Sequence, residues 1–266
     1  MQQQQEQRTT TQKKSVVKHS ELDINNVDIT EPKPNKETKQ QLQSSVNYTF
    51  DANYHSKFRV ETPCLDTFKP SSFEGTNYSL TLRCSGPNLN DINNFFDFNR
   101  EIDSLGINHC VKYSSAIFKG KKVTAEMSDM FYNKLVKPSA GKDGTVYPDR
   151  VSIKIKMNND NVPDVLVYKS STTPVEFSSI DEFIGLFENN VPITCIIEYY
   201  MYFVNGKAGI NGRVLQIKMS SAEDKIGRRP TSYAFSEEPV TSNITSNSNV
   251  VNEDVTNDSE DENENN

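Results

Sequence analysis

The stretch from Val191 to Met219 limits the fold of this chain more than any other part of the sequence. It consists of two runs rich in β-branched and aromatic residues, with Asn205-Gly206 between them. Such runs favour β-strands, and Asn-Gly is typical of a tight turn whose residues adopt positive φ. The stretch therefore predicts a long β-hairpin.

Side chains alternate along both arms of this predicted hairpin. One face is apolar and is expected to join the core: Ile193, Cys195, Ile197, Tyr199, Met201, Phe203, Leu215, Ile217 and Met219. The other face combines polar, basic and aromatic side chains: Glu198, Tyr200, Tyr202, Gln216 and Lys218. Successive strand residues point to opposite sides of a sheet, so the second set is expected to face outward.

Two further cations lie near the predicted turn. Lys207 follows Asn205-Gly206, and Arg213 stands beside Gly212, where a β-bulge is expected to redirect the second arm. Tyrosine rings edged by Lys and Arg suit stacked bases and a phosphate chain. An edge hairpin with ordinary amphipathic tyrosines fits the same residues, and the pattern alone leaves both interpretations open.

Composition divides the chain into three parts. Residues 1–45 contain no aromatic side chain, and residues from about 237 onward are mainly Asn, Ser, Asp and Glu. Such segments bury too little apolar surface to offset the entropy lost on ordering, so both ends are predicted to be disordered. We expect a disordered N-terminal arm (1–45), one folded domain (46–222) and a disordered acidic tail (223–266).

Charge is segregated along the sequence. The tail from Glu237 holds nine of the 36 acidic residues and no base, which leaves 27 acids against 29 bases elsewhere. The body is therefore nearly neutral, and an anion-binding surface has to be a local patch. One candidate is the acid-free segment from Ser104 to Ala125, which contains Lys119, Lys121 and Lys122.

A second candidate patch is the predicted strand from Arg150 to Met157. Its alternation places Val151 and Ile153 on a core face and places Arg150, Lys154 and Lys156 on the opposite face. A basic strand face can serve solvation alone. It becomes a ligand surface if it adjoins the aromatic face of the hairpin.

The remaining elements follow from local patterns. Further strands are expected within 46–65, 77–84, 108–118 and 162–168. A helix should begin after Asn88 and end at Gly106, a short helix should span 124–136, and Ser179 to Glu182 forms a capping box for a third helix. The Gly-x-x-Gly segment within 139–149 is expected to be a mobile loop.

No pattern points to an enzyme, a cofactor or a metal. The four cysteines are widely spaced with no Cys-x-x-Cys, and the three histidines are scattered. Phosphate-binding glycine loops, nucleophile elbows and compact acidic motifs are missing from the sequence. Without a signal peptide or a long apolar run, the chain is expected to be soluble and intracellular, with no membrane partner.

Three segments together resemble a known family. They are Pro148–Lys156, the hairpin residues Tyr202–Lys207 and Gly212–Gln216, and the acidic run Asn252–Glu264. Residues 46–266 are similar to the OB-fold single-stranded DNA-binding proteins of short-tailed phages and their relatives in nucleo-cytoplasmic large DNA viruses. Family tails often end in an aromatic residue, whereas this chain ends in Asn266.

This resemblance implies a mainly β (α+β) fold with a single OB-fold-like barrel and inserted helices. It also implies sequence-independent binding of single-stranded DNA in replication, recombination and repair, in a host cytoplasm or nucleus if the protein is viral. The acidic tail would compete for the DNA surface and recruit a DNA polymerase or helicase through Glu253, Asp254, Asp258, Glu260, Asp261, Glu262 and Glu264. A homodimer is left open.

Two rival functions fit the same residues. In a structural or scaffold β protein, the tyrosine-rich hairpin would be a protein–protein surface and the tail would only confer solubility. In an RNA-binding OB protein, the same barrel face would bind unpaired RNA.

Overall fold

The computed structural model describes residues 15–34, 41–52, 54–73, 75, 77–169, 172–187 and 191–220. The contacts within the chain separate residues 1–236 from residues 237–266. The second unit lies outside the described residues, as does the whole tail from residue 223 that the sequence predicted to be disordered.

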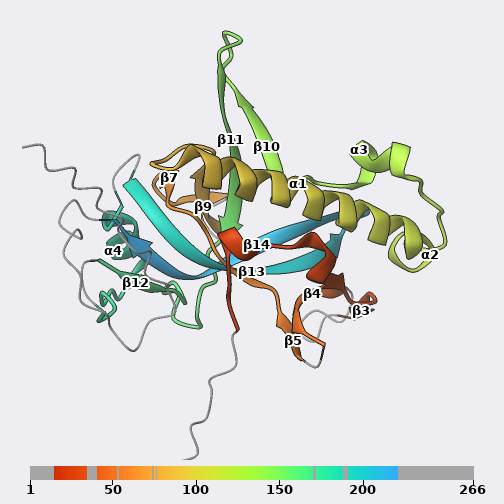
Figure 1. Cartoon of the computed structure of the whole chain (residues 1–266), viewed down its shortest axis with the longest axis horizontal. Coiled ribbons are helices and arrows are strands. Elements are labelled where there is room, and N and C mark those ends of the chain that lie inside the picture. The colour runs from red at the N-terminus through yellow and green to blue at the C-terminus, as the bar shows by residue number, and fades with distance from the viewer. Residues whose placement is uncertain are drawn as a thin grey trace, which may run out of the picture. The chain divides into compact units, whose positions relative to one another are not determined.

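Five strands close a barrel: β7 (Leu65–Thr67), β9 (Asn77–Arg83), β11 (Val146–Lys154), β13 (Val191–Val204) and β14 (Lys207–Met219). They pair in the order β13, β7, β9, β11, β14 and back to β13 (Figure 1). All these pairs are antiparallel except β11 with β14. An antiparallel three-strand meander whose third strand pairs in parallel with the fifth is the OB topology. The predicted OB-fold-like barrel is therefore confirmed.

The long hairpin forms as predicted, with one local difference. Asn205 and Gly206 make the turn at φ of 52° and 72°. The β-bulge lies at Leu215, because Ile197 pairs with Val214 whereas Ile196 pairs with Gln216. Gly212, where the bulge was expected, instead faces the core. A Cβ there would collide with Ile197 and Ile153, which explains the glycine. Leu215 is consequently half-buried rather than a core residue.

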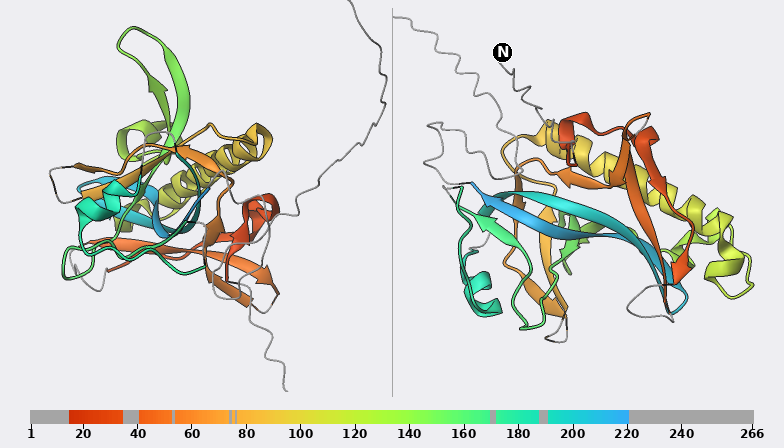
Figure 2. Two further views of the ribbon diagram at one scale, coloured as in Figure 1. Left: turned by 90° about the vertical axis from the view of Figure 1, so that its left-hand side faces the viewer. Right: turned by 90° about the horizontal axis from the view of Figure 1, so that it is seen from below.

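The two faces of β13 are divided only in part as the alternation predicted, because Ile196 and Glu198 on the face expected to be outward are also buried. Its odd-numbered residues from Ile193 to Phe203 are buried in the core, while Tyr200 and Tyr202 on the opposite face are half-buried. The hairpin runs through the centre of the described unit (Figure 2). Further strands extend the sheet on both of its sides: β4 (Leu42–Asp51), β5 (Tyr54–Lys57), β6 (Arg59–Glu61), β8 (Ser71–Phe73) and β12 (Leu166–Tyr168).

The prediction of disorder is wrong for residues 15–34. They form β1 (Val17–Lys18), the 3₁₀ helices η1 (His19–Glu21) and η2 (Ile24–Asn26), β2 (Val27–Ile29) and β3 (Lys33–Pro34). Strand β1 pairs with β6, and β2 and β3 pair with β4. The isolated aliphatic residues here, such as Val17 and Ile24, pack onto the core. Composition averaged over the arm conceals this, because strand pairing with distant residues supplies the missing burial.

The predicted strand at 108–118 is wrong, because a helix continues through most of it. Helix α1 (Leu89–Lys112) begins at the expected cap Asn88 but runs past Gly106. A Cβ at Gly106 would collide with the ring of Tyr132, so this glycine permits close packing rather than ending the helix. Burial at Ile102, Gly106 and Cys110 shows a helical period of four. The short helices α2 (Ser114–Ile117), η3 (Ala125–Met127) and α3 (Ser128–Phe131) follow.

A hairpin replaces the mobile loop predicted at 139–149, and the helix predicted at 124–136 already ends at Phe131, before this hairpin begins at Val136. Strand β10 (Val136–Ala140) pairs with β11, and the two strands project from the barrel (Figure 1). Gly144, at φ of 83°, lies in the connecting turn. Only the tip of the predicted loop is therefore a turn.

Helix α4 (Ile180–Gly185) lies between β12 and β13 in sequence and starts at the predicted capping box. The backbone N–H of Glu182 donates to the side chain of Ser179 at 3.2 Å. The carboxylate of Glu182 accepts from Ser178 instead of from the cap residue. Phe183 and Phe187 are buried and anchor this segment in the core.

Candidate nucleic-acid interface

The outward-facing side chains of β9, β11, β14 and β13 form one surface, which we call the outer face. Strand pairing fixes its geometry, because residues directly opposite each other on neighbouring strands point to the same side of the sheet. Arg150 of β11 lies opposite Arg83 of β9 on one side and Lys137 of β10 on the other. Three cations therefore form a row across three strands.

A second row crosses the outer face four residues further along β11. Lys154 pairs with Ser79 of β9 and with Arg213 of β14, and Arg213 in turn lies opposite Glu198 of β13. Glu198 also pairs with Arg59 of β6. At about 3.3 Å per residue, the two rows lie about 13 Å apart along the strands. Between them, the Thr81 and Ser152 hydroxyls are 3.3 Å apart.

Glu198 is the one acid in these two rows, and it is buried and neutralised. Its side chain accepts from Arg213 Nη2 at 2.6 Å and from Arg59 Nε at 2.8 Å, and Lys57 Nζ lies 3.4 Å away. Burial alone would raise its pKa. The hydrogen bond from Arg59 and the charges of all three cations outweigh burial and lower that pKa. The outer face therefore stays cationic despite this carboxylate.

Tyr200 and Tyr202 continue the outer face along β13, two and four residues beyond Glu198. Burial raises the pKa of Tyr200 to about 12, and the neighbouring Tyr202 adds to this effect. The Tyr202 ring lies on Gly209, and its hydroxyl accepts from the Asn133 amide at 3.2 Å. Each ring is thus partly covered by its own protein, in contrast to the flat exposed platform that the sequence suggested.

Phe68 is an aromatic residue of this face that the sequence did not single out. It follows β7, remains 41% exposed, and lies under the guanidinium of Arg83, which is 4.9 Å from the ring centroid. In the sequence Phe68 is an isolated aromatic between Thr67 and Lys69, with no periodicity that would have marked it. Only the pairing of β7 with β9 brings it beside the cationic row.

The other predicted site residues lie in different places. Lys207, at the hairpin turn, donates to the Met130 carbonyl at 2.6 Å, and Lys218 is half-buried beyond the bulge. Lys119, Lys121 and Lys122 are exposed after α2, at the end of α1 farthest from β7 and β9 (Figure 1). They do not join the two cationic rows.

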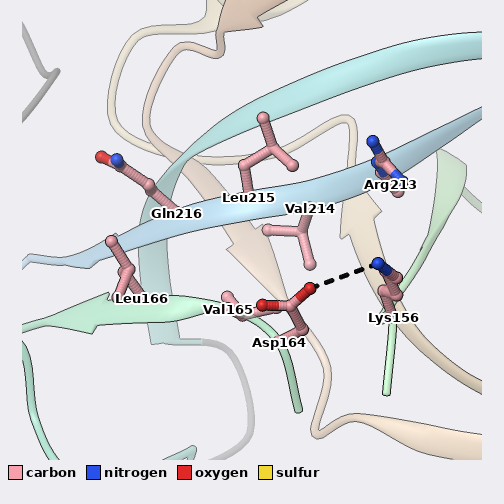
Figure 3. Close-up of a pocket in the computed structure, with 8 residues that line it drawn as sticks. All are labelled: Lys156, Asp164, Val165, Leu166, Arg213, Val214, Leu215 and Gln216. Carbon is pink, nitrogen blue, oxygen red and sulfur yellow. Dashed lines mark ion pairs between the residues drawn. The ribbon is translucent and has the colours of Figure 1, made fainter. Parts of the chain in front are cut away.

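A pocket of about 300 Å³ opens beside the second row (Figure 3). It lies on the edge of β14 between two pairings: β11 pairs with Arg213, and β12 pairs from Gln216 onward. Within these described strands, neither neighbour is in register with Val214 or Leu215. The pocket is lined by Lys156, Asp164, Val165, Leu166, Arg213, Val214, Leu215 and Gln216. It therefore contains two of the predicted cations, Lys156 and Arg213.

The part of the chain that the structure describes contains neither a candidate metal site nor a helix that could span a membrane. Within it, no group of three or more His, Cys, Asp or Glu side chains is arranged to hold a metal ion. In the same residues, no helix combines the length and the apolar character needed to cross a membrane. The predicted tail acids, Glu253 to Glu264, lie outside this part.

No protein-family model matches this chain, and no curated protein sequence does. Among solved structures, the single-stranded DNA-binding protein from bacteriophage Enc34 matches with 11% identity and a TM-score of 0.34, over 71% of this chain and 89% of that one. Its C-terminal truncation matches with 12% identity and a TM-score of 0.36, over 74% and 98%. Its complex with single-stranded DNA matches with 12% identity and a TM-score of 0.34, over 74% and 99%.

Proposed function

We propose that this protein binds single-stranded DNA without sequence preference through its outer face. The observation that carries the proposal is the pair of cationic rows, Arg83–Arg150–Lys137 and Lys154–Arg213, across adjacent barrel strands. Phosphate contacts by Lys and Arg supply the sequence-independent part of nucleic-acid affinity. The only carboxylate in these rows, Glu198, is buried and already paired.

The two cationic rows together mark the path that we propose for the DNA strand. Aromatic side chains lie at both ends of this path, and they favour a single strand over a duplex. Phe68 lies beside the first row, and Tyr200 and Tyr202 lie beyond the second. Stacking on an aromatic ring requires an unpaired base, so a duplex would gain only the phosphate contacts. A scaffold function is the second candidate, and the half-buried state of both tyrosines is the observation that favours it.

The proposal is tested by fluorescence anisotropy with a labelled random-sequence single strand, and with matched duplex and RNA strands as competitors. We expect the single strand to bind more tightly than the duplex, with log K falling steeply as log salt rises. Arg150→Ala and Lys154→Ala should each reduce the salt slope by about one phosphate. Equal affinity for the duplex, or a flat salt dependence, would contradict DNA binding and favour the scaffold function.

Two further variants set the limits of the path. Lys134→Ala is the matched control, because this lysine belongs to neither cationic row and its ammonium lies 3.3 Å from Asp129, so the salt slope should not change. Lys121→Ala decides whether the basic segment after α2 contacts the same strand. A reduced slope would extend the path along α1, and an unchanged slope would restrict it to the barrel.

We also propose that the tail from Glu237 acts on this face, and that the protein serves replication, recombination and repair. Nine acids and no base make the tail a competitor for cations that otherwise bind phosphate. When DNA displaces it, the tail would be free to recruit a polymerase or a helicase. Pull-down of replication proteins with and without the tail tests the recruitment.

A further inference from the structure

The pocket beside Arg213 has two chemically different ends. Lys156 and Arg213 lie together at one end, Leu166 and Gln216 lie at the other, and Leu215 lies between them (Figure 3). Asp164 stands between the ends, and its carboxylate is 3.5 Å from Lys156 Nζ. One end thus offers positive charge, and the other offers apolar surface with an amide.

Three features of the fold produce this opening. After Lys154 pairs with Arg213, β11 separates from β14, and β12 joins β14 only where Leu166 meets Gln216. The bulge at Leu215 lies in the same interval. A departing strand, a late-joining strand and a bulge coincide here, so this edge of the barrel is open over two residues of β14.

Two buried polar atoms at this edge have no hydrogen-bond partner among the described residues, Arg213 Nε and Gln216 Oε1. Buried polar groups in folded proteins are nearly always paired, so unpaired ones indicate a missing partner. Arg213 Nε is a donor, and the Gln216 amide offers both a donor and an acceptor after a side-chain rotation. These two groups without hydrogen-bond partners therefore belong to residues at opposite ends of one pocket.

We propose that this pocket holds one nucleotide of the bound single strand, turned out of the stack on the outer face. Its base contacts Leu166 and Leu215 with an edge toward Gln216, and its phosphate lies at Arg213 and Lys156. This inference rests on the proposed function. Because Arg213 belongs to both the pocket and the second cationic row, a strand that follows the row passes the mouth of the pocket.

The volume and the charges suit a nucleotide better than the alternatives. About 300 Å³ is at the lower limit for small-ligand sites, so the pocket has room for a single base and sugar. A purely apolar ligand would leave Arg213 Nε and Gln216 Oε1 without a hydrogen-bond partner. An isolated phosphate would leave the surface of Leu166 unused, which is 45% exposed.

The experiment uses the full chain and an oligo-dT strand that carries photoreactive 4-thiothymidine. Irradiation and mass spectrometry should map crosslinks to peptides containing residues 164–166 or 213–216. Leu166→Trp fills the pocket from its exposed wall, and it should remove these crosslinks and weaken binding about fivefold or more, the loss expected for one base contact. Leu89→Trp makes the same change at a site that is 58% exposed on α1, and it should alter neither.

Each outcome decides the proposal. If the wild-type protein binds the strand but crosslinks only outside these peptides, or if Leu166→Trp binds like Leu89→Trp, the pocket holds no nucleotide and the proposed function still stands. If the wild-type protein does not bind single strands, both proposals fail. Should Leu166→Trp not fold, Gln216→Ala replaces it, and an unchanged crosslink yield and affinity in that variant would overturn the pocket.

Discussion

At the scale of single residues, Asp103 connects helix α1 to the projecting hairpin. Its carboxylate accepts from the backbone N–H groups of Leu135 and Val136 at 2.9 and 3.3 Å, and from the Tyr132 hydroxyl at 3.1 Å. Burial raises the pKa of Asp103 to about 6, although these hydrogen bonds oppose the increase. The carboxylate thus fixes the start of β10 while its charged form remains unfavourable in the folded protein.

This raised pKa predicts a stability that falls as pH rises. Between the ordinary value of 3.8 and about 6, the folded protein holds a proton on Asp103 that the unfolded chain has released. The contribution of Asp103 to the free energy of unfolding is therefore fully present below about pH 4 and is lost by about pH 6. The shift of roughly two units corresponds to at most about 3 kcal/mol.

Urea unfolding of the wild-type protein and of Asp103→Asn, from pH 4 to pH 7.5, measures this effect. The difference in free energy of unfolding between them cancels the titration of all other groups. It should fall between pH 4 and 6 and then level off. A difference that stays constant across this range would mean that the carboxyl titrates normally.

Glu198→Gln tests the neutralising role of the buried acid on the outer face. The amide keeps the shape but loses the charge that holds Arg59, Arg213 and Lys57. We expect a loss of about 1–3 kcal/mol in stability, because hydrogen bonds to a charged group are removed. DNA affinity at low salt should rise and its salt slope should steepen, since released cations can bind phosphate.

The matched control for that variant is Glu101→Gln, which removes the same charge from an exposed position on α1. It separates the effect of net charge from that of the local cluster, and it should change both stability and affinity little. Weaker DNA binding in Glu198→Gln would instead show that the acid positions Arg213 for the strand.

At the scale of elements, the sequence predicted those strands whose burial follows their own alternation. Strand β13 is an example, because its odd residues are buried and Tyr200 and Tyr202 are not fully covered. The predictions failed where the decisive contact is distant in sequence. Gly106 continues a helix because Tyr132 packs on it, and Val17 is ordered by β6.

The same limit applies to the candidate site. Arg150, Lys154 and Arg213 could be named from strand alternation, but their alignment in rows depends on pairing with β9 and β14. Phe68 could not be found, because its neighbour Arg83 reaches it through strand pairing rather than local pattern. Alternation predicts which side a residue faces, whereas pairing determines what lies beside it.

Phe68 is exposed whereas Tyr200 and Tyr202 are half-buried, so replacing these aromatic residues of the outer face should affect stability to different extents. Phe68→Ala should weaken single-strand binding by about 1–3 kcal/mol with little change in stability, because the ring is exposed and can stack a base. The double variant Tyr200→Ala with Tyr202→Ala should lose binding by a similar amount per ring, while the fold survives with reduced stability. Anisotropy titrations and thermal unfolding of each variant give the two quantities.

The prediction for Phe68 and the prediction for the two tyrosines of β13 are contradicted by different results. If Phe68→Ala binds normally, the strand does not reach the β7 end of the outer face. If the double tyrosine variant loses stability but not affinity, those rings serve the contact between β13 and β4 and not DNA.

At the scale of the whole molecule, acidic charge without any base is confined to the end of the chain. The body up to residue 236 has 29 bases and 27 acids, and the remaining 30 residues add nine acids, which gives the net charge of −7. A polyanionic segment joined to a cationic face has a high effective concentration near it, so even weak contacts would compete with DNA. Net charge alone would suggest a protein that repels DNA, whereas the local rows favour binding.

Deleting the tail from Glu237 is therefore expected to strengthen single-strand binding, and most strongly at low salt. Simple repulsion should fade smoothly as the Debye length falls to about 8 Å near physiological salt. A tail that occupies the outer face must be displaced, so it should also inhibit the truncated protein competitively when added back as a separate peptide. A peptide of the same composition with its acids changed to amides is the control and should not inhibit.

In NMR spectra of the full chain, the tail resonances should shift in Arg150→Ala and Lys154→Ala if the tail contacts those cations. If the truncated protein binds no more tightly than the full chain at low salt, the tail neither repels nor competes, and its acids serve solubility or partner binding alone.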